Sequence, residues 1–181
     1  MNFTEPKGIL QYAKIKGLYR RAFPKCERKP FSIIRKMQKK GKSDIWYFED
    51  ETGFLGLATT INSDSIVLID YFAVTERQRG KGKGAKMLKA LISHYAGKAV
   101  FLEIEIPYES AENFAERVKR KNFYINAGLT PMGTTAKLFG VDMELLGVGC
   151  TLNFDEYRNF YLENYGKFAY DNITKADIEL K

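Results

Sequence analysis

The sequence predicts an α+β fold in which a mixed, mostly antiparallel central sheet is flanked by helices. Three observations support this class. Near the N-terminus, apolar residues recur at the spacings of three and four that are typical of helices. Along the next three segments they alternate with polar residues, as in strands. Helical and strand patterns then follow one another to the end of the chain. The 181 residues include 45% hydrophobic and 28% charged residues, a composition typical of a globular domain large enough to bury a core. We therefore expect a single domain over residues 1–181.

Two helices are predicted near the N-terminus. Residues 8–22 carry apolar side chains at helical spacing, and this helix is expected to end before Pro24. Pro30 suits the first position of a second, short helix, which Gly41 terminates.

Alternating polar and apolar residues then predict three antiparallel strands, over residues 45–49, 54–61 and 65–74, separated by turn sequences. A helix over 85–97 and a strand over 99–106 follow. The strands on either side of this helix are expected to form one parallel pair with a right-handed crossover. The remaining predicted elements are a helix over 111–127, strands over 133–140 and 142–152, and an aromatic-rich helix over 154–165.

Charge is distributed unevenly along the chain. Residues 1–24, 25–42 and 75–98 have net charges of +4, +7 and +6, whereas the whole chain has +7, so the remaining residues carry −10. This separation suits a polyanionic ligand at one place and a cationic ligand at another. The basic segment 25–42 makes a nucleic-acid-binding module an alternative function, but no recognised reader motif accompanies it, so a nucleic acid partner is not favoured.

Other classes receive no support. No apolar run approaches the roughly 20 residues that cross a bilayer, and the N-terminus has no signal-peptide pattern, so we expect a cytoplasmic protein without a membrane partner. Cys26 and Cys150 do not form a disulfide framework. With a single histidine in the chain they also supply no dedicated metal site, and no metal is expected.

The most informative segment is a glycine-rich loop between a strand and a helix, with the sequence Arg79-Gly80-Lys81-Gly82-Lys83-Gly84-Ala85. The first N–H groups of a helix have no intrahelical partner and carry a partial positive charge. Glycine lets such a backbone approach an anion and adopt positive φ, so that successive N–H groups can cradle phosphate oxygens. Arg79, Lys81 and Lys83 add positive charge. We therefore expect this loop to bind a phosphate group.

Two known phosphate-loop patterns can be compared with this segment. The Walker pattern fails, because Ala85 stands five residues after Gly80. The dinucleotide pattern GxGxxA matches at Gly80, Gly82 and Ala85, and Glu103 follows at about the 20-residue distance of a ribose-binding acid. An NAD(P)-binding oxidoreductase is therefore an alternative. Against it, residues 75–79 separate the loop from its strand, and three antiparallel strands precede it.

The stretch FAVTERQRGKGKGAKML, residues 72–88, resembles the acyl-CoA-binding signature of the GNAT superfamily of N-acetyltransferases. That signature is a strand ending in valine, a short polar loop, and the pattern [Q/R]-x-x-G-x-[G/A] opening a helix. RKNFYINAGL, residues 120–129, resembles a second motif of the family, with Leu129 in place of phenylalanine. The resemblance covers residues 66–129, and the elements on the acceptor side would then be 1–43 and 130–181.

The resemblance implies a GNAT-like fold and an N-acetyltransferase that moves acetyl from acetyl-CoA to a primary amine by direct attack. Acetyl-CoA would be the acyl-donor co-substrate. Its pantetheine arm would lie against the backbone of the strand end, and the acetyl group would sit in a gap between residues 65–74 and 99–106. The residues implied in cofactor binding are Phe72, Ala73, Val74, Arg79, Gly80, Lys81, Gly82, Lys83, Gly84 and Ala85.

The reaction needs an acid for the departing thiolate and a base for the attacking amine. By motif position the resemblance implies Tyr124 as the acid, and a phenol with a pKa near 10 can protonate a thiolate. Candidate bases are the carboxylates on central strands, Asp70, Glu103 and Glu105, because burial could raise their pKa. A structural ion pair, or a hydrogen bond to a neighbouring helix, is the alternative role for each of these acids.

The acceptor is not specified by these motifs. A small-molecule amine or a protein amine would suit the reaction, and the −10 balance outside the basic stretches favours a small cationic amine. The resemblance also makes a homodimer one assembly to consider.

Overall fold

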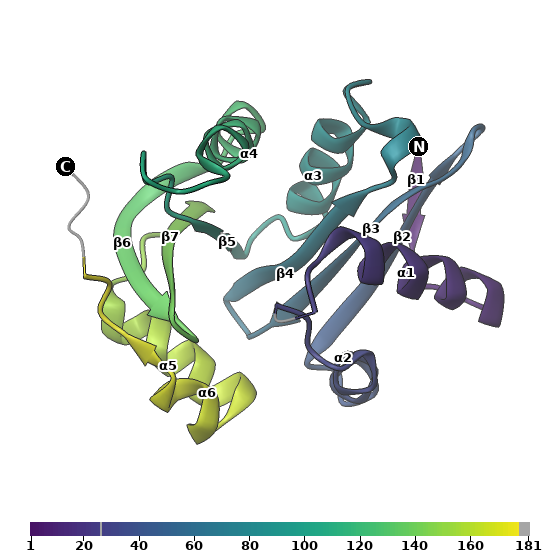
Figure 1. The fold of residues 1–181 in the computed structure, drawn as a ribbon. Helices are drawn as coiled ribbons and strands as arrows, with labels where there is room; N and C mark the ends of the chain where they lie inside the picture. The colour runs from purple at the N-terminus through teal and green to yellow at the C-terminus, as the bar shows by residue number, and fades with distance from the viewer. Residues whose placement is uncertain (26, 178–181) are drawn as a thin grey trace. The chain divides into compact units, whose positions relative to one another are not determined.

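The computed structural model describes residues 1–25 and 27–177, so that Cys26 lies outside the described residues. The chain divides into two compact units, Met1–His94 and Tyr95–Lys181 (Figure 1). The first unit contains β1 (Asn2–Thr4), α1 (Ile9–Ala22), α2 (Phe31–Lys39), β2 (Ser43–Asp50), β3 (Gly53–Asn62), β4 (Ile66–Val74), the 3-10 turn η1 (Glu76–Gln78) and α3 (Lys83–His94).

The four strands of the first unit pair in the order β1-β2-β3-β4, and all three pairings are antiparallel. Tight turns join these strands into a meander. β2 and β3 are buried on both faces, over residues 45–48 and 55–61, because helices cover both sides of the sheet. The β3–β4 register shifts by one residue: Thr60 pairs with Ile69, whereas Thr59 pairs with Tyr71. Asp70 is thus the extra residue of a β-bulge in β4.

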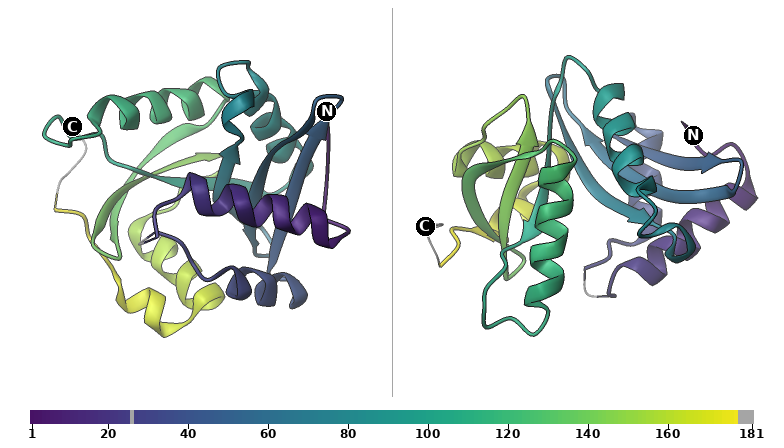
Figure 2. Two further views of the ribbon diagram at one scale, coloured as in Figure 1. Left: turned by 45° about the vertical axis from the view of Figure 1, so that its right-hand side comes forward. Right: turned by 90° about the horizontal axis from the view of Figure 1, so that it is seen from above.

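Helices α1 and α2 cover one face of this sheet, and the left view of Figure 2 shows α1 lying across the strands. The core beneath them includes Ile15, Leu18, Tyr19, Ile34, Ile45, Tyr47, Leu57, Tyr71 and Ala73. Helix α3 packs on the opposite face, where its His94 ring meets Phe3 and Trp46 at centroid distances of 5.5 and 4.8 Å. The apolar stripe of α3, Met87, Leu88 and Leu91, is buried.

The second unit contains β5 (Ala99–Glu105), α4 (Phe114–Asn126), β6 (Thr130–Leu138), β7 (Val141–Val148), α5 (Phe154–Tyr165), α6 (Lys167–Asp171) and β8 (Ile173–Thr174). Its strands pair antiparallel in the order β5-β7-β6-β8.

The two long helices of this unit lie on opposite faces of its strands. Lys121 of α4 reaches Glu144, which pairs with Ile104, whereas Phe160 of α5 packs edge-on against Phe101, at 5.2 Å between ring centroids. Ile104 and Phe101 are an odd number of residues apart on one strand, so their side chains face opposite sides.

The predicted class, α+β with a mostly antiparallel sheet flanked by helices, is confirmed. The aromatic helix was predicted with its observed bounds, and the other helices and strands agree within a few residues. Four short elements, β1, η1, α6 and β8, were not predicted. The parallel pair predicted around the 85–97 helix would join the two units and stays a prediction, as does the single domain.

Candidate functional site

The glycine-rich loop connects the end of β4 to the start of α3 in the first unit. Gly80 and Gly82 have φ values of +73° and +70°, in the left-handed region that favours glycine. Gly84 and Ala85 lie inside α3, which begins at Lys83, two residues earlier than predicted. The three glycines therefore have different positions: Gly80 and Gly82 allow the chain to turn, and Gly84 lies in the first turn of the helix.

The start of α3 presents unpaired backbone donors. The first bond of helical type runs from the Lys86 N–H to the Gly82 carbonyl, at 3.3 Å. The N–H groups of Lys83, Gly84 and Ala85 precede it and have no intrahelical partner. The first turn of α3 contains no acidic residue, so no carboxylate of the helix itself opposes a phosphate at its positive end.

Of the three cations in the loop, one is already paired. Lys83 forms an ion pair with Asp50, whose side chain is 1% exposed. Lys83 was expected to add charge for a phosphate, but this contact largely neutralises it. Arg79 and Lys81 are exposed, and the Arg79 side chain also donates from Nε to the Val74 carbonyl at 3.2 Å. These two cations remain to meet an anion at the loop.

The strand end before the loop has a defined backbone direction. The Thr75 N–H donates to the Leu55 carbonyl of β3 at 2.8 Å, and Ala73 pairs with Leu57. Peptide groups alternate in direction along a strand, so the N–H of Val74 points away from β3. A backbone N–H that points away from the neighbouring strand can bind an extended amide-containing chain, as implied for Phe72, Ala73 and Val74.

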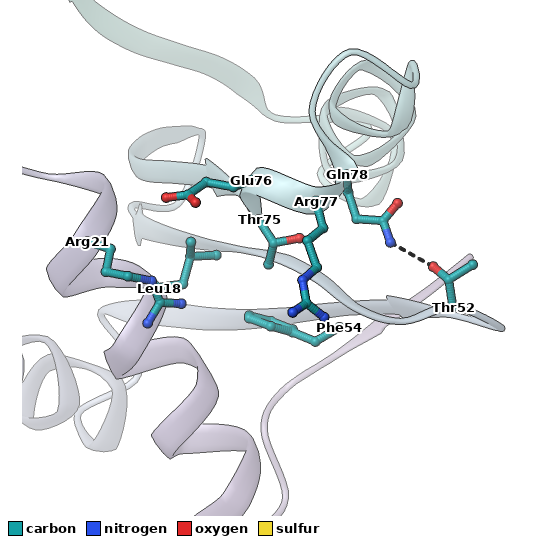
Figure 3. Close-up of a pocket in the computed structure, with 8 residues that line it drawn as sticks. All are labelled: Leu18, Arg21, Thr52, Phe54, Thr75, Glu76, Arg77 and Gln78. Carbon is teal, nitrogen blue, oxygen red and sulfur yellow. Dashed lines mark hydrogen bonds between the residues drawn. The ribbon is translucent and has the colours of Figure 1, made fainter.

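A pocket of about 420 Å³ adjoins this loop in the first unit (Figure 3). The loop contributes Thr75 to Gln78, and the Gln78 side chain donates to the Thr52 hydroxyl at 3.0 Å. Arg21 of α1 and Arg77 of the loop both line the pocket. The other lining residues are Leu18, Thr52, Phe54, Thr75, Glu76 and Gln78.

The predicted acid, Tyr124, lies on the last turns of α4 in the second unit. Burial raises the pKa of Tyr124 to about 12, while the Arg120 charge acts in the opposite direction. The phenol is therefore protonated throughout the physiological range. Its ring packs against Phe123 at 5.1 Å between centroids, and its hydroxyl makes no hydrogen bond within residues 1–25 and 27–177.

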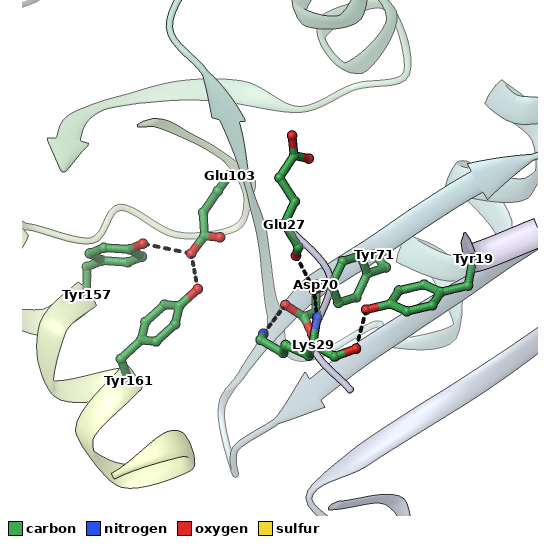
Figure 4. A network of polar contacts seen from close by, with 8 residues as sticks. All are labelled: Tyr19, Glu27, Lys29, Asp70, Tyr71, Glu103, Tyr157 and Tyr161. Atoms are coloured by element: carbon green, nitrogen blue, oxygen red, sulfur yellow. Dashed lines mark hydrogen bonds and ion pairs between the residues drawn. The ribbon is translucent and has the colours of Figure 1, made fainter. Parts of the chain in front are cut away.

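Glu103 and Glu105 of β5 have different partners. The Oε1 atom of Glu103 accepts hydrogen bonds from the hydroxyls of Tyr157 and Tyr161 on α5, at 2.8 and 2.7 Å (Figure 4). Glu105 forms ion pairs with two arginines of α4, Arg117 at 2.8 Å and Arg120 at 2.9 Å. Each of these two carboxylates is thus anchored to a helix of the second unit.

Asp70, the bulged residue of β4, also forms an ion pair. Its Oδ1 lies 2.6 Å from the Lys29 Nζ, and the Asp70 side chain is 7% exposed. Lys29 belongs to the connection between α1 and α2, so this contact attaches that connection to the sheet (Figure 4). The alternative role foreseen for Asp70, a structural ion pair, is the one that its geometry favours.

A model of the acetyltransferase (GNAT) family matches residues 12–119 of this chain. The chain belongs to the GNAT acetyltransferase family. The match contains the whole first-unit site from β4 to α3 and ends before Tyr124, so the role of Tyr124 rests on the second motif alone.

Solved structures similar to this GNAT chain share its fold. A Bacteroides thetaiotaomicron protein assigned to the GNAT family aligns with a TM-score of 0.78 at 20% identity, over 92% of this chain and 99% of that one. Spermidine N-acetyltransferase from Vibrio cholerae, in complex with CoA and spermine, aligns with a TM-score of 0.64 at 12% identity, over 81% and 94%. An aminoglycoside 6'-N-acetyltransferase complexed with coenzyme A gives 0.60 at 11% identity, over 82% and 96%. The search of curated proteins found no match.

Sequence reasoning missed two contacts of this GNAT site. Asp50, the last residue of β2, was read only as part of a turn, yet it binds the first residue of α3. Lys29 was counted among the basic residues of 25–42 without a partner, whereas Asp70 holds it. Both pairs join residues more than 30 positions apart, and no local pattern in the sequence indicates such pairs.

None of the helices in residues 1–25 and 27–177 has the length and apolarity needed to span a bilayer. The same residues contain no group of three or more His, Cys, Asp or Glu side chains placed to hold a metal ion.

Proposed function

We propose that this GNAT chain is an N-acetyltransferase that moves the acetyl group of acetyl-CoA to a primary amine. The observation that carries the proposal is the loop from β4 to α3, where two left-handed glycines precede three unpaired helix N–H groups. The phosphates of CoA suit that donor set. Membership of the family and the CoA bound to two neighbours of similar fold support the same donor.

In the proposed mechanism, the neutral amine attacks the thioester carbonyl directly. The C–N bond forms, the C–S bond breaks, and the sulfur leaves with the bonding electron pair. Tyr124 gives its proton to that sulfur, and the raised pKa keeps the phenol protonated until it is used. The tyrosinate then recovers a proton from water.

The attacking ammonium must lose a proton before or during this step, and we propose Glu103 as the base. The hydroxyls of Tyr157 and Tyr161 fix the position of its Oε1 atom, as a base that has to meet the amine requires.

The donor is tested first, by thermal unfolding with acetyl-CoA, with NADP and with a short DNA duplex in parallel. A ligand at 100 times its Kd should stabilise the protein by roughly 2.7 kcal/mol. We expect a shift with acetyl-CoA alone, followed by thiol release when a suitable amine is added. A shift with NADP or DNA and none with acetyl-CoA would contradict the proposal.

A further inference from the structure

A second pocket, of about 400 Å³, lies in the first unit between α1, α2 and their connection. It is distinct from the pocket beside the glycine loop, because the two share no lining residue. The lining is strongly basic and otherwise aromatic or small. Its residues are Lys16, Tyr19, Arg20, Lys25, Arg28, Lys29, Pro30, Phe31 and Ser32.

Four of the five cations around this pocket have no acidic partner among residues 1–25 and 27–177. Lys29 is paired with Asp70. The other four, Lys16, Arg20, Lys25 and Arg28, form no ion pair within the described part of the chain. The Arg28 Nε is also buried and has no hydrogen-bond partner there. Cations gathered around one small pocket repel each other, and an anion within it would remove that repulsion.

The start of α2 adds backbone donors to the same pocket. Helix α2 has nine residues, Pro30 provides no side-chain cap, and no acidic residue lies in its first turn. Phe31 and Ser32 line the pocket, and their N–H groups precede the first observed bond, from the Ile33 N–H to the Pro30 carbonyl at 2.8 Å. The dipole of α2 therefore favours negative charge at the place where the basic side chains gather.

Hydrogen bonds hold the backbone of Glu27 and Lys29, the residues on either side of Arg28 in the chain (Figure 4). The Tyr71 hydroxyl donates to the Glu27 carbonyl at 2.8 Å and accepts from the Lys29 N–H at 3.1 Å. The Tyr19 hydroxyl donates to the Lys29 carbonyl at 3.0 Å. Burial raises the pKa of Tyr19 to about 12 and raises that of Tyr71 as well, so both phenols stay neutral donors. The cations are thus presented by a preorganised backbone.

We propose that this pocket binds an anionic group, a phosphate or carboxylate, of the amine that the enzyme acetylates. The inference rests on the proposed function and narrows its substrate class. Guanidinium groups bind phosphate and carboxylate through paired N–H donors, and Arg20 and Arg28 supply two of them. The basic lining would repel a polyamine. The pocket therefore favours an amine that carries an anionic group, whereas the charge balance of the sequence favoured a cationic amine.

The binding experiment uses the 181-residue chain saturated with CoA, so that the glycine loop is occupied. Pyrophosphate is titrated into this complex by calorimetry. We expect binding to the wild-type complex and a loss of at least about tenfold in the Arg20→Gln/Arg28→Gln double variant. The matched control is Lys36→Gln/Lys39→Gln, which removes the same charge from the exposed side of α2 and should retain wild-type binding.

Three results would overturn the inference. Absence of pyrophosphate binding, or equal loss in both double variants, would show that the pocket is no specific anion site. Displacement of CoA by pyrophosphate, with no binding to the saturated complex, would assign the anion site to the phosphates of the donor. Circular dichroism and thermal midpoints of each variant separate loss of binding from loss of folding.

The acceptor is then tested with matched amines, by thiol release from acetyl-CoA. O-phosphoethanolamine is compared with ethanolamine, and β-alanine with propylamine, while spermidine is the cationic comparison. We expect kcat/KM at least about tenfold higher for the anionic member of a pair, and no such preference in the Arg20/Arg28 variant. A preference for spermidine or ethanolamine would refute the inference. The proposed function fails separately, if acetyl-CoA produces no thermal shift in the wild-type protein.

Discussion

Lys83, the first residue of α3, forms an ion pair with Asp50, the last residue of β2. Asp50 also accepts hydrogen bonds from the Thr52 N–H at 2.8 Å and the Thr52 hydroxyl at 2.6 Å. One carboxylate thus fixes the β2–β3 turn and the start of the helix that we assign to phosphate binding. The Lys83 and Thr52 hydrogen bonds hold the pKa of Asp50 well below its ordinary value of 3.8.

This depressed pKa predicts an acid-dependent loss of stability. A carboxylate whose pKa is lower in the folded state stabilises the fold above its unfolded pKa, and that contribution is lost as the pH falls toward the folded value. Urea unfolding should show wild type more stable than Asp50→Asn near pH 6, with the difference shrinking below about pH 4. A difference that stays constant from pH 6 to pH 2.5 would contradict this account of the pair.

Gly82 is predicted to be necessary for acetyl-CoA binding. Alanine at this left-handed position should cost about 1–2 kcal/mol of strain or turn the N–H groups away from the phosphate. Gly41→Ala is the matched control, because Gly41 has a φ of +71° in a turn outside the loop, with the same open space around it. Calorimetry should give at least about tenfold weaker acetyl-CoA binding for Gly82→Ala only. Equal affinity in the two variants would remove the loop from the CoA site.

Tyr124→Phe should lower kcat by about 100-fold and leave acetyl-CoA affinity unchanged, because it removes only a proton donor. With a pKa of about 12, the phenol should stay active at pH 10, where an ordinary tyrosine would be half ionised. The pH profile of kcat checks this. Tyr108→Phe is the control, since burial also raises the pKa of Tyr108 to about 12. An alkaline fall with a midpoint near 10 that vanishes in Tyr124→Phe would show that burial does not protect the acid.

The effects of Glu103→Gln and Asp70→Asn on kcat and on stability should distinguish the catalytic base from an acid with a structural role. We expect Glu103→Gln to reduce kcat by about 100-fold at neutral pH and less at high pH, where more of the amine is already neutral. Asp70→Asn should mainly lower the thermal midpoint, because it breaks the ion pair with Lys29. If Asp70→Asn gave the larger loss of kcat without loss of stability, the assignment would be reversed.

Gly56 of β3 is predicted to be intolerant of any side chain. A Cβ at this position would lie 2.2 Å from the Ala73 carbonyl oxygen and 2.6 Å from the Met87 Cε. Gly56→Ala should therefore lower the free energy of unfolding by about 1–3 kcal/mol. Gly17→Ala, within α1 and with Arg21 Nη1 at 3.4 Å as the nearest atom, should instead raise it by about 0.5–1 kcal/mol. Chemical denaturation of both variants measures these opposite signs.

The main elements of the fold were predictable because their patterns are local. The stripe of α3 and the alternation of β2, β3 and β4 require only neighbouring residues. The capping box of α5, in which Asn153 and Glu156 bond each other's backbone, similarly fixes where that helix begins. The short strands β1 and β8 were missed because two or three residues carry no periodicity. They are strands only because a longer strand lies beside them.

The candidate site was predictable in its backbone and less so in its side chains. Glycine spacing indicates the loop, since left-handed φ values demand glycine. The ion pairs of Lys83 with Asp50 and of Asp70 with Lys29 join residues that are 33 and 41 positions apart, and a local sequence pattern does not indicate such pairs. The basic segment 25–42 was visible as charge, but only the fold shows which of its residues surround a pocket.

The hydroxyl of Tyr71 accepts a hydrogen bond from one backbone amide and donates one to a carbonyl two residues earlier. A tight turn usually closes such a ring with its own backbone, and glycine, asparagine or proline is then needed at its centre. Here a phenol from a distant strand closes it. Residues 27–29 therefore need no glycine, asparagine or proline to form the turn, and all three are charged. Their composition can change to suit a different ligand without changing the course of the chain.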